Sequence, residues 1–380
     1  MCQISHFVGL SGVGGVQRNF VEYMNYQDSS NCKLKHKVYT LGKVDSQYKL
    51  PISVHDIRNP VNLISLIIDI VSKHKIVHMY NNLVSLKLAF MLLILPACKI
   101  ILHERGTVWN IPSSRKVLLQ FVAWKSHLIL TNSNATKTLL RRKFNISKNK
   151  ISVLYNGVNT EIKCRKKFLE RDHLSVFRVG FIGRLDTPKG VHVLIDAIRI
   201  LSDNNIDLFI AGDGVLRSAL KDQSKDLKNV HFVGRVDTPY DFLRSIDLLV
   251  VPSIREPFGN VCIEAGLCKT PVLAANIDGI PEIIDNKVSG ELIIPTQDVS
   301  IKFPKDAIPL PEYVVNPLTQ RLSRPKQIDS EILAKKILEL SKSQTLLDQY
   351  KRELYKKVIN CFSVENYSKK LYNIYCDIYN

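Results

Sequence analysis

The sequence lacks the cysteine patterns that define metal-binding or disulfide-stapled domains. Its eight cysteines show no C-x-x-C spacing and no cluster with histidine. Zinc sites and small secreted scaffolds depend on such spacings, so we expect neither a metal centre nor a disulfide framework. The cysteine usage fits a reducing cytoplasm. Cys262 and Cys268 lie in apolar helical context and are predicted to be core residues.

The sequence also lacks a long uninterrupted apolar run. The longest candidate, from Leu83 to Leu102, is broken by Lys87, Pro96 and Lys99. A bilayer span needs about 20 apolar residues, and the continuous part of this run is much shorter. We predict a buried helix followed by a buried strand, with a transmembrane helix as the alternative. The first residues show neither a basic region nor a cleavage site, so no signal peptide is expected.

Acidic residues are scarce in the first half of the chain. Residues 1–160 contain 21 Lys and Arg against 6 Asp and Glu, a net charge of +15 out of a total of +18. Basic clusters lie at 33–37 and 141–150. Such a one-sided surface attracts polyanions, although it is also compatible with a role in solubility alone. Because neither an aromatic RNA-stacking strand nor a KH-type loop is present, we expect an anionic membrane surface or lipid pyrophosphate as partner and no nucleic acid.

What the sequence does contain is an alternation of short apolar runs with helical patterns. The length of 380 residues allows two ordinary domains. Continuous apolar strands indicate burial on both faces, as in parallel sheets, so we predict an α/β protein with two doubly wound units. The predicted strands are 4–10, 36–41, 76–79, 99–103 and 127–131, then 177–182, 207–211, 230–233, 248–252, 271–274 and 291–294.

The Asn-Gly pair at residues 156 and 157 marks the predicted domain boundary. It follows a strand-like run and precedes a basic polar stretch that reaches to about residue 175. We therefore divide the chain into 1–157, 158–362 and a terminal segment 363–380. That last segment carries one apolar stripe and is predicted to be a helix.

The stretch from Arg255 to Gly266 is the most informative in the chain. It places Glu256 and Glu264 eight residues apart, with a Pro-Phe-Gly turn between them and a predicted helix start at Asn260. A helix N-terminus at the mouth of a parallel sheet suits an anionic group. The carboxylates can accept hydrogen bonds from neutral hydroxyls, which sugars supply. The alternative is a surface turn that carries two solvated acids.

With its neighbours, this stretch resembles the nucleotide-sugar-binding domain of retaining glycosyltransferases of the GT-B fold, family four. The resemblance is close over about 150 to 295 and looser before that. It implies two Rossmann-like lobes that face each other across a cleft. Residues 1–157 would bind the acceptor, 158–362 the donor, and helix 363–380 would cross back to the first lobe. The matching segments, in the order of the family, are 179–190, 208–214, 230–236, 256–264 and 277–290.

The resemblance assigns Arg184 and Lys189 to the donor diphosphate. They flank a short Asp-Thr-Pro turn after a buried strand, and with the helix N-terminus after Gly259 they would stabilise the leaving group. No Asp-x-Asp triplet, which holds a divalent metal in many glycosyltransferases of the other major fold, occurs in the sequence. We therefore expect no metal and no further cofactor. The alternative is two ordinary surface cations.

The resemblance also assigns Glu264, placed in the first turn of its helix, to the ribose diol of the donor. Glu256 would bind a hydroxyl of the transferred sugar, and the base would lie near Val236, held largely by backbone. A covalent role for Glu256 is possible in principle. Front-face substitution, in which the departing phosphate oxygen takes the acceptor proton, is preferred. The amides expected to hold sugar and phosphate oxygens are those of Phe258, Gly259, Asn260 and Val261.

In the first domain, the glycine cluster that includes Gly14 and Gly15 follows the first strand and opens a helix. Small residues permit close approach of a phosphate or sugar, although a purely structural turn is the alternative. His103 ends an apolar strand, where the family often has a histidine close to the donor sugar; a structural role is the alternative. His78 is expected in the core or at the rim. Glu104 and Arg105 are acceptor-side candidates.

The predicted function is that of a metal-independent, retaining glycosyltransferase. It would move a hexose-type sugar from a UDP-, GDP- or ADP-sugar to a hydroxyl of a lipid-linked or growing glycan. The family implies bacterial surface polysaccharide or lipopolysaccharide synthesis (O-antigen or capsule), by a cytoplasmic protein at the inner membrane face. The alternatives are a nucleotide-sugar epimerase of similar fold and a non-catalytic binding module. The proline-rich residues 296–330 form an insertion that either shapes acceptor access or is a simple loop.

Overall fold

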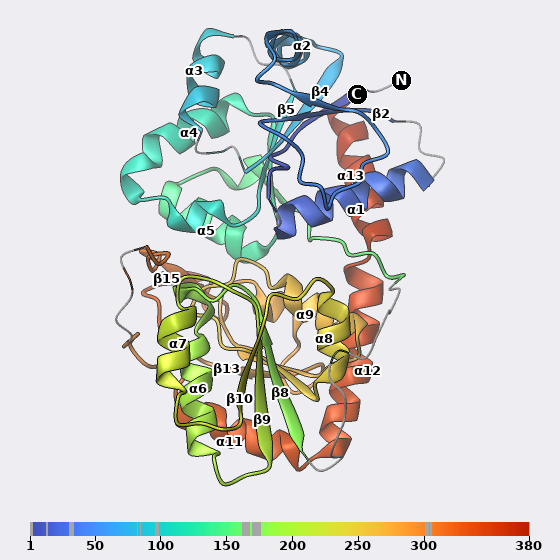
Figure 1. Ribbon diagram of the computed structural model, residues 1–380. Helices are drawn as coiled ribbons and strands as arrows, with labels where there is room; N and C mark the ends of the chain where they lie inside the picture. The colour runs from blue at the N-terminus through green and yellow to red at the C-terminus, as the bar shows by residue number, and fades with distance from the viewer. Residues whose placement is uncertain are drawn as a thin grey trace. The chain divides into compact units, whose positions relative to one another are not determined.

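The computed structural model describes residues 3–12, 14–29, 34–81, 83, 85–95, 99–161, 168, 176–300, 304 and 306–379. The chain forms two compact units: unit 1 is Met1–Asn159 with Phe362–Asn380, and unit 2 is Thr160–Cys361. Each unit is built on a parallel β-sheet with helices packed on it (Figure 1). The prediction of an α/β protein with two Rossmann-like units is confirmed. The sequence placed boundaries after residues 157 and 362, and the chain changes unit after Asn159 and Cys361.

The sheet of unit 1 has the strand order β3-β2-β1-β4-β5-β6-β7, with every pair parallel. The order reverses at β1, which pairs with β2 on one side and β4 on the other. Buried apolar residues fill the central strands, as expected for a sheet covered on both faces. The strands are β1 Gln3–Phe7, β2 Lys35–Thr40, β3 Val54–Asp56, β4 Lys75–Tyr80, β5 Ile100–Glu104, β6 Leu128–Thr131 and β7 Ile151–Val153.

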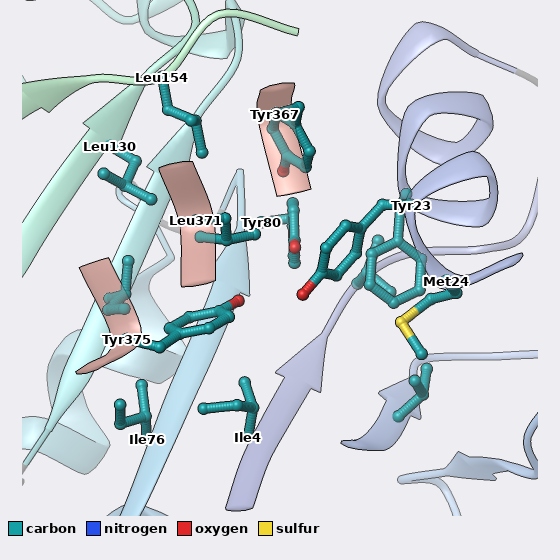
Figure 2. Packing of buried hydrophobic residues seen from close by; sticks show 14 of the residues in the cluster. Ile4, Tyr23, Met24, Ile76, Tyr80, Leu130, Leu154, Tyr367, Leu371 and Tyr375 are labelled. Carbon is teal, nitrogen blue, oxygen red and sulfur yellow. The ribbon is translucent and has the colours of Figure 1, made fainter. Parts of the chain in front are cut away.

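The last helix of the chain completes the core of unit 1. It packs on α1 and β4, and its side chains Tyr367, Leu371 and Tyr375 lie among Ile4, Tyr23 and other buried residues (Figure 2). The burial of these three large side chains favours the packing of the helix on unit 1. The helices of unit 1 are α1 Gly15–Ser29, α2 Pro60–Val71, α3 Leu86–Ile94, α4 Lys116–Lys125, α5 Asn134–Phe144 and α13 Val364–Tyr379.

The longest apolar run forms α3 followed by β5, so the predicted order of helix and strand is confirmed. The strand is fully buried. The helix is not, because Leu86, Phe90 and Leu93 are each more than half exposed; the prediction of a buried helix was wrong on this point. Apolar composition shows that one face can pack, but it does not show whether anything covers the other. Among the described residues, no helix combines the length and apolar character needed to cross a bilayer.

The sheet of unit 2 has the order β10-β9-β8-β11-β12-β13, again parallel throughout. Its strands are β8 Phe177–Ile182, β9 Ile206–Ala211, β10 Val230–Gly234, β11 Leu248–Val251, β12 Val272–Ala275 and β13 Glu291–Ile293. Its helices are α6 Val191–Ile200, α7 Arg217–Gln223, α8 Pro239–Ser245, α9 Asn260–Leu267, α10 Ile280–Ile283, α11 Ser330–Ser341 and α12 Gln344–Cys361. Cys262 and Cys268 are buried, as predicted.

The proline-rich insertion contains a hairpin. Its antiparallel strands are β14 Val314–Asn316 and β15 Arg321–Ser323. The turn closes with Gln320 at φ +53° and its amide bonded to the carbonyl of Asn316 at 2.9 Å. Residues 301–303 and 305 lie outside the described part. The expectation of irregular structure therefore missed a short ordered element, whose strands are too brief to show alternation in the sequence.

Candidate functional site

The strand order of unit 2 reverses between β8 and β11, which pair at the centre of the sheet. In open α/β sheets, ligands bind outside the carboxyl ends of the strands at such a reversal. The segments that leave these two strands are residues 183–190 and 252–259. They define the candidate site.

The two segments are fixed against each other at Gly190. Its φ is +65°, and a Cβ atom there would lie 2.1 Å from the carbonyl oxygen of Pro252. The amides of Ile254 and Arg255 donate to the carbonyl of Pro188, at 2.9 and 3.2 Å. Only glycine permits this backbone conformation together with this close approach. The short turn that carries Lys189 is thereby held beside the end of β11.

Lys189 and Glu256 meet across these segments. The Nζ atom of Lys189 lies 2.6 Å from Oε2 of Glu256, with side-chain exposures of 26% and 10%. The hydroxyl of Ser253 donates to the same carboxylate oxygen at 3.4 Å. The carboxylate is thus nearly buried, whereas the ammonium keeps one side open to a ligand. The site thus places the ammonium of Lys189 next to the carboxylate of Glu256, which can accept hydrogen bonds from hydroxyl groups.

The backbone at Glu256 is held by a buried acid, Asp278, which follows β12. The amide of Glu256 donates to Oδ2 of Asp278 at 2.9 Å, and the amide of Gly279 donates to the carbonyl of Glu256 at 3.1 Å. Asp278 itself has a φ of +47°. These bonds fix the direction in which the Glu256 side chain leaves the chain, because they restrain its backbone on both sides.

Burial controls the protonation of this acid. It raises the pKa of Asp278 to about 7, although backbone hydrogen bonds from Val315 and Glu256 oppose that rise. Burial also lowers the pKa of the neighbouring Arg255 guanidinium. The insertion contributes directly, because the amide of Val315 in β14 donates to Oδ1 of Asp278 at 2.7 Å.

The insertion reaches a second loop of the site in the same way. Asp186 caps the turn after β8 by accepting from the amide of Thr187 at 2.9 Å. The same Oδ1 atom accepts from the amide of Ile308 at 2.9 Å. Two buried carboxylates, Asp186 and Asp278, therefore attach the insertion to the loops that carry Lys189 and Glu256.

Helix α9 begins directly after the second segment. Gly259 is its N-cap residue, with φ +106°, and within the described residues no side-chain hydrogen bond caps the helix. The first amides of a helix have no acceptor within the helix, and they carry the positive end of its dipole. The helix therefore starts with amides of Asn260 and Val261 that suit an anion. Phe258 is buried beside them.

Helix α9 starts at Asn260, as predicted. Glu264 is its fifth residue and therefore stands at the beginning of the second turn, whereas it was expected in the first, because one turn holds only about 3.6 residues. Its side chain is half-buried.

The remaining predicted donor residues lie at neighbouring strand ends. Arg184 follows β8 and is exposed, and the described part of the chain offers it no ion-pair partner. Val236 follows β10 and is half-buried. The end of β10 is held to β9 by a bond of 2.7 Å from the amide of Gly212 to the carbonyl of Gly234. Both residues therefore lie along the same carboxyl edge of the sheet as Lys189.

In unit 1, His103 ends β5 in a buried position. Its Nδ1 atom lies 3.2 Å from Nε2 of His78, and Nδ1 of His78 lies 2.6 Å from the hydroxyl of Tyr375. Burial lowers the pKa of His103 well below its usual value. Its Nε2 has no hydrogen-bond partner in the described part of the chain. A neutral imidazole with one unused nitrogen is suited to a single hydrogen bond with a ligand. His78 is a core residue, as expected.

The glycine cluster of unit 1 opens α1, which begins at Gly15. The amide of Gly14 donates to the hydroxyl of Tyr48 at 3.3 Å. Val13 lies outside the described residues. Gly14, Gly15 and His103 thus lie at carboxyl ends of strands of unit 1, whereas the other predicted site residues belong to unit 2.

The two acceptor-side candidates of unit 1 are buried and engaged locally. Glu104 accepts from the amides of Gly106 and Val108, at 2.9 and 3.0 Å. The Nε atom of Arg105 donates to Asn156 at 3.1 Å, and another of its nitrogens donates to Asn19. These contacts tie β5 to α1 and to the end of the unit. Their geometry is that of structural residues.

Sequence reasoning missed Asp186 and Asp278 as parts of the site. Both lie inside segments that matched the family pattern, and each stands just after an apolar strand, where buried acids bind amides. That position was a usable signal. Their bonds to Ile308 and Val315 could not be foreseen, because those partners are 122 and 37 residues away.

Comparison with protein families agrees with this geometry and defines the class of the protein. Residues 176–306 match the family described as Glycosyl transferases group 1. Residues 41–162 match the family described as Glycosyltransferase Family 4. Together the two matches cover most of the chain, one in each unit. The chain therefore carries a domain of the group 1 glycosyltransferases in unit 2 and a domain of glycosyltransferase family 4 in unit 1.

Individual relatives support the same assignment. An uncharacterised glycosyltransferase of Methanocaldococcus jannaschii is 33% identical over 214 residues, which are 51% of this chain and 54% of that protein. The N-acetylgalactosamine-N,N'-diacetylbacillosaminyl-diphospho-undecaprenol 4-alpha-N-acetylgalactosaminyltransferase of Campylobacter jejuni is 32% identical over 164 residues, 42% of this chain and 44% of that one. The chain therefore spans about half, or less, of these curated relatives.

A solved structure agrees over the whole length. HepE of Anabaena, crystallised with UDP and glucose, superposes with a TM-score of 0.74 and covers 99% of both chains at 19% sequence identity. At this identity the likeness establishes the fold.

Proposed function

We propose that this glycosyltransferase moves a hexose-type sugar from a nucleotide-diphosphate sugar to a hydroxyl of a lipid-linked or growing glycan, with retention at the anomeric carbon. The observation that carries the proposal is the contact of 2.6 Å between Lys189 and Glu256 at the strand reversal of unit 2. A donor presents a diphosphate next to a ring of hydroxyls. The site presents a cation next to a nearly buried carboxylate.

Charge on the departing diphosphate would be stabilised by protein groups without a metal ion. Lys189 and the exposed Arg184 supply two cations at the end of β8, and the uncapped start of α9 supplies amides after Gly259. Preorganised donors of this kind act where charge develops in the transition state. In the free protein Glu256 holds Lys189 in place, and an arriving diphosphate would compete for the exposed side of that ammonium.

The residues suggest positioning more than covalent catalysis. Glu256 is held by Lys189 and Ser253, so its carboxylate is stabilised and a poor nucleophile; we assign it to a sugar hydroxyl. Glu264 would bind the ribose diol and Val236 would lie near the base. In the mechanism that we prefer, the acceptor attacks the anomeric carbon on the face from which the phosphate departs, and its proton passes to the departing phosphate oxygen. This reaction needs only alignment of the substrates and stabilisation of charge. His103 would donate one hydrogen bond to the donor sugar from its unused Nε2, and the loop at Gly14 and Gly15 would lie close to the diphosphate or the acceptor.

The acceptor and the pathway follow from charge and from one relative. Unit 1 carries most of the positive charge of the chain, and the Campylobacter jejuni relative acts on a diphospho-undecaprenol glycan. We propose a lipid-linked acceptor at the inner face of the cell membrane, in synthesis of a surface polysaccharide such as O-antigen or capsule. The protein would be cytoplasmic and peripherally bound.

A screen of UDP-, GDP- and ADP-sugars with EDTA present tests the proposal. Product is analysed by NMR at the anomeric carbon. We expect transfer with retained configuration in EDTA. A need for added divalent metal, or an inverted product, contradicts the mechanism.

The variant Glu264→Ala separates the enzyme from its rivals. We expect it to lower kcat/KM for the donor about 100-fold or more, because the ribose diol loses its charged hydrogen-bond acceptor. The matched control is Glu339→Ala on α11, an exposed acid outside the site, which should leave the rate unchanged. Donor conversion without any acceptor would indicate an epimerase. Binding of donor without turnover in the unsubstituted protein would indicate a binding module.

A further inference from the structure

Helices α3 and α4 pack side by side in unit 1 (Figure 1). Both carry large apolar side chains that are exposed to solvent. Six of these side chains are between 59% and 76% exposed. Scattered exposed apolar residues are normal in proteins, but a contiguous group of this size marks an interaction site. We name it the α3–α4 face; its residues are Leu86, Phe90, Leu93, Ile94, Val117 and Trp124.

Helix α3 is apolar on both of its faces, one buried and one exposed. Leu88, Ala89 and Leu92 point into the core. The exposed residues Leu86, Phe90, Leu93 and Ile94 recur at the spacing of one helix face. A helix that is apolar on both sides is normally covered on both sides.

Helix α2 lies on the same side of the sheet. The connections from β3 to β4, β4 to β5 and β5 to β6 run in one direction along the sheet. Right-handed crossovers therefore place α2, α3 and α4 on the same face of that sheet. On α2, Val61, Ile64 and Ile68 are each at least 56% exposed.

The charges around the α3–α4 face are of one sign. Residues 70–160 contain fourteen Lys and Arg and a single acid, Glu104, which is fully buried. Lys87 and Lys116 lie exposed on α3 and α4. The ammonium of Lys125 lies 5.1 Å from the centre of the Trp124 ring.

Helix α5, which packs on α4, continues this positive border. Arg141 and Arg142 are exposed in its last turn. The Nζ atom of Lys150 donates to the carbonyl of Ser126 at the end of α4, at 2.7 Å. Burial and the neighbouring cations Lys148 and Arg141 lower the pKa of Lys137, so these positive charges are close enough to repel one another.

We propose that the α3–α4 face docks onto an anionic lipid bilayer, with Phe90, Leu93 and Trp124 entering the interface and the surrounding lysines and arginines at the phosphates. Tryptophan prefers the boundary between headgroups and acyl chains, and lysine keeps its charge in water while its stem lies on apolar surface. Apolar insertion and attraction to anionic headgroups then add. The inference rests on the proposed function, because a lipid-linked acceptor lies at such a surface.

A second copy of the chain fits this face less well. A symmetric dimer would bring each apolar patch onto its own copy, and the cations around it would then meet cations. Like charges placed opposite each other across an interface are strongly unfavourable. A bilayer rich in anionic lipid offers the opposite sign of charge around an apolar interior.

Flotation of the whole chain with lipid vesicles tests the inference. Vesicles of phosphatidylcholine alone are compared with vesicles that contain phosphatidylglycerol. We expect binding to the anionic vesicles, weakened by salt. The double variant Phe90→Ser with Leu93→Ser should reduce the partition coefficient by about tenfold or more for each side chain, which is the effect of burying a large apolar group. The control is Ile200→Ser in unit 2, where Ile200 is 52% exposed and binding should not change.

Tryptophan fluorescence of the unsubstituted protein gives a second measurement. The chain has two tryptophans; Trp109 is buried and Trp124 is exposed. We expect anionic vesicles to shift the emission to shorter wavelength and brominated lipids to quench it. The variant Trp124→Phe should abolish both changes, because Trp109 is already shielded.

Three results would overturn the inference: no flotation with anionic vesicles, unquenched Trp124 in brominated lipid, or a dimer in solution that the Phe90→Ser with Leu93→Ser variant dissociates. A separate assay of sugar transfer to a water-soluble acceptor tests the proposed function. In that assay the double variant should transfer sugar at the normal rate. Flotation without any transfer would refute the proposed function and leave the docking surface standing.

Discussion

Replacing Lys189 by methionine removes one charge from the site and keeps the apolar stem of the side chain. In the folded protein it leaves the nearly buried carboxylate of Glu256 without the cation that lies 2.6 Å away. Exposed ion pairs contribute at most about 1 kcal/mol, and removal of one partner from a fully buried pair costs about 3–5 kcal/mol. Because the ammonium is partly exposed, we expect Lys189→Met to lower the free energy of unfolding by about 1–2 kcal/mol.

A double-mutant cycle isolates the interaction between the two residues. Lys189→Met, Glu256→Gln and the double variant are unfolded in urea, and we expect a coupling free energy of about 1 kcal/mol. The control is the pair Lys351 and Asp348 on α12, which lie 3.1 Å apart and are more exposed than the Lys189–Glu256 pair, at 33% and 55%. Its coupling should be too small to resolve.

The same variants separate the contribution of the pair to folding from its contribution to sugar transfer. Lys189→Met should reduce the rate of transfer about 100- to 1,000-fold, since the cation would stabilise the leaving diphosphate. A cycle with no coupling would refute the structural part of this reasoning. An unchanged rate in Lys189→Met would refute its assignment to the diphosphate.

Three further predictions concern neighbouring residues. Glu264→Gln should raise the KM for the nucleotide sugar about tenfold or more, because a ribose hydroxyl loses a charged acceptor; an unchanged KM in initial-rate assays excludes that contact. Gly190→Ala should lower the free energy of unfolding by about 3 kcal/mol or more in urea, whereas Gly9→Ala, which meets no atom within 4 Å, should be neutral; equal effects would contradict the close approach to β11. Burial raises the pKa of Asp278 to about 7, so the folded state binds the proton of this carboxyl more tightly than the unfolded state does. The free energy of unfolding of the unsubstituted protein, relative to that of Asp278→Asn, should therefore fall as the pH rises from 4 to 7. A difference that does not depend on pH would refute the burial of this acid.

Much of the fold could be predicted because buried parallel strands are continuous apolar runs. The strand predicted at 177–182 is β8 at the same residues, and those at 207–211 and 230–233 differ from β9 and β10 by one residue. The short edge strand β3, Val54–Asp56, was missed. Two of its three residues, His55 and Asp56, are polar, so no apolar run marks it, whereas the equally short β13 was predicted.

The site was predictable in composition and only partly in geometry. The family resemblance and their positions after apolar strands made Lys189 and Glu256 candidates, but nothing in the sequence gives the contact between them. The position of Asp278 after an apolar strand was visible, but its hydrogen bond from the insertion was not, because that contact and the burial of the acid are properties of the tertiary structure. The exposure of Phe90 was hidden for the same reason, since an apolar helix reads alike whether both sides are covered or one is open to solvent.

The central claim is that fixed cations and amides of unit 2, without a metal ion, hold the diphosphate of the donor. A crystal structure of the protein grown with a nucleotide-diphosphate sugar in EDTA tests it most directly. We expect phosphate oxygens within hydrogen-bond distance of Lys189, Arg184 and the first amides of α9. A diphosphate held through a metal ion, or one bound away from the strand reversal between β8 and β11, would contradict the claim.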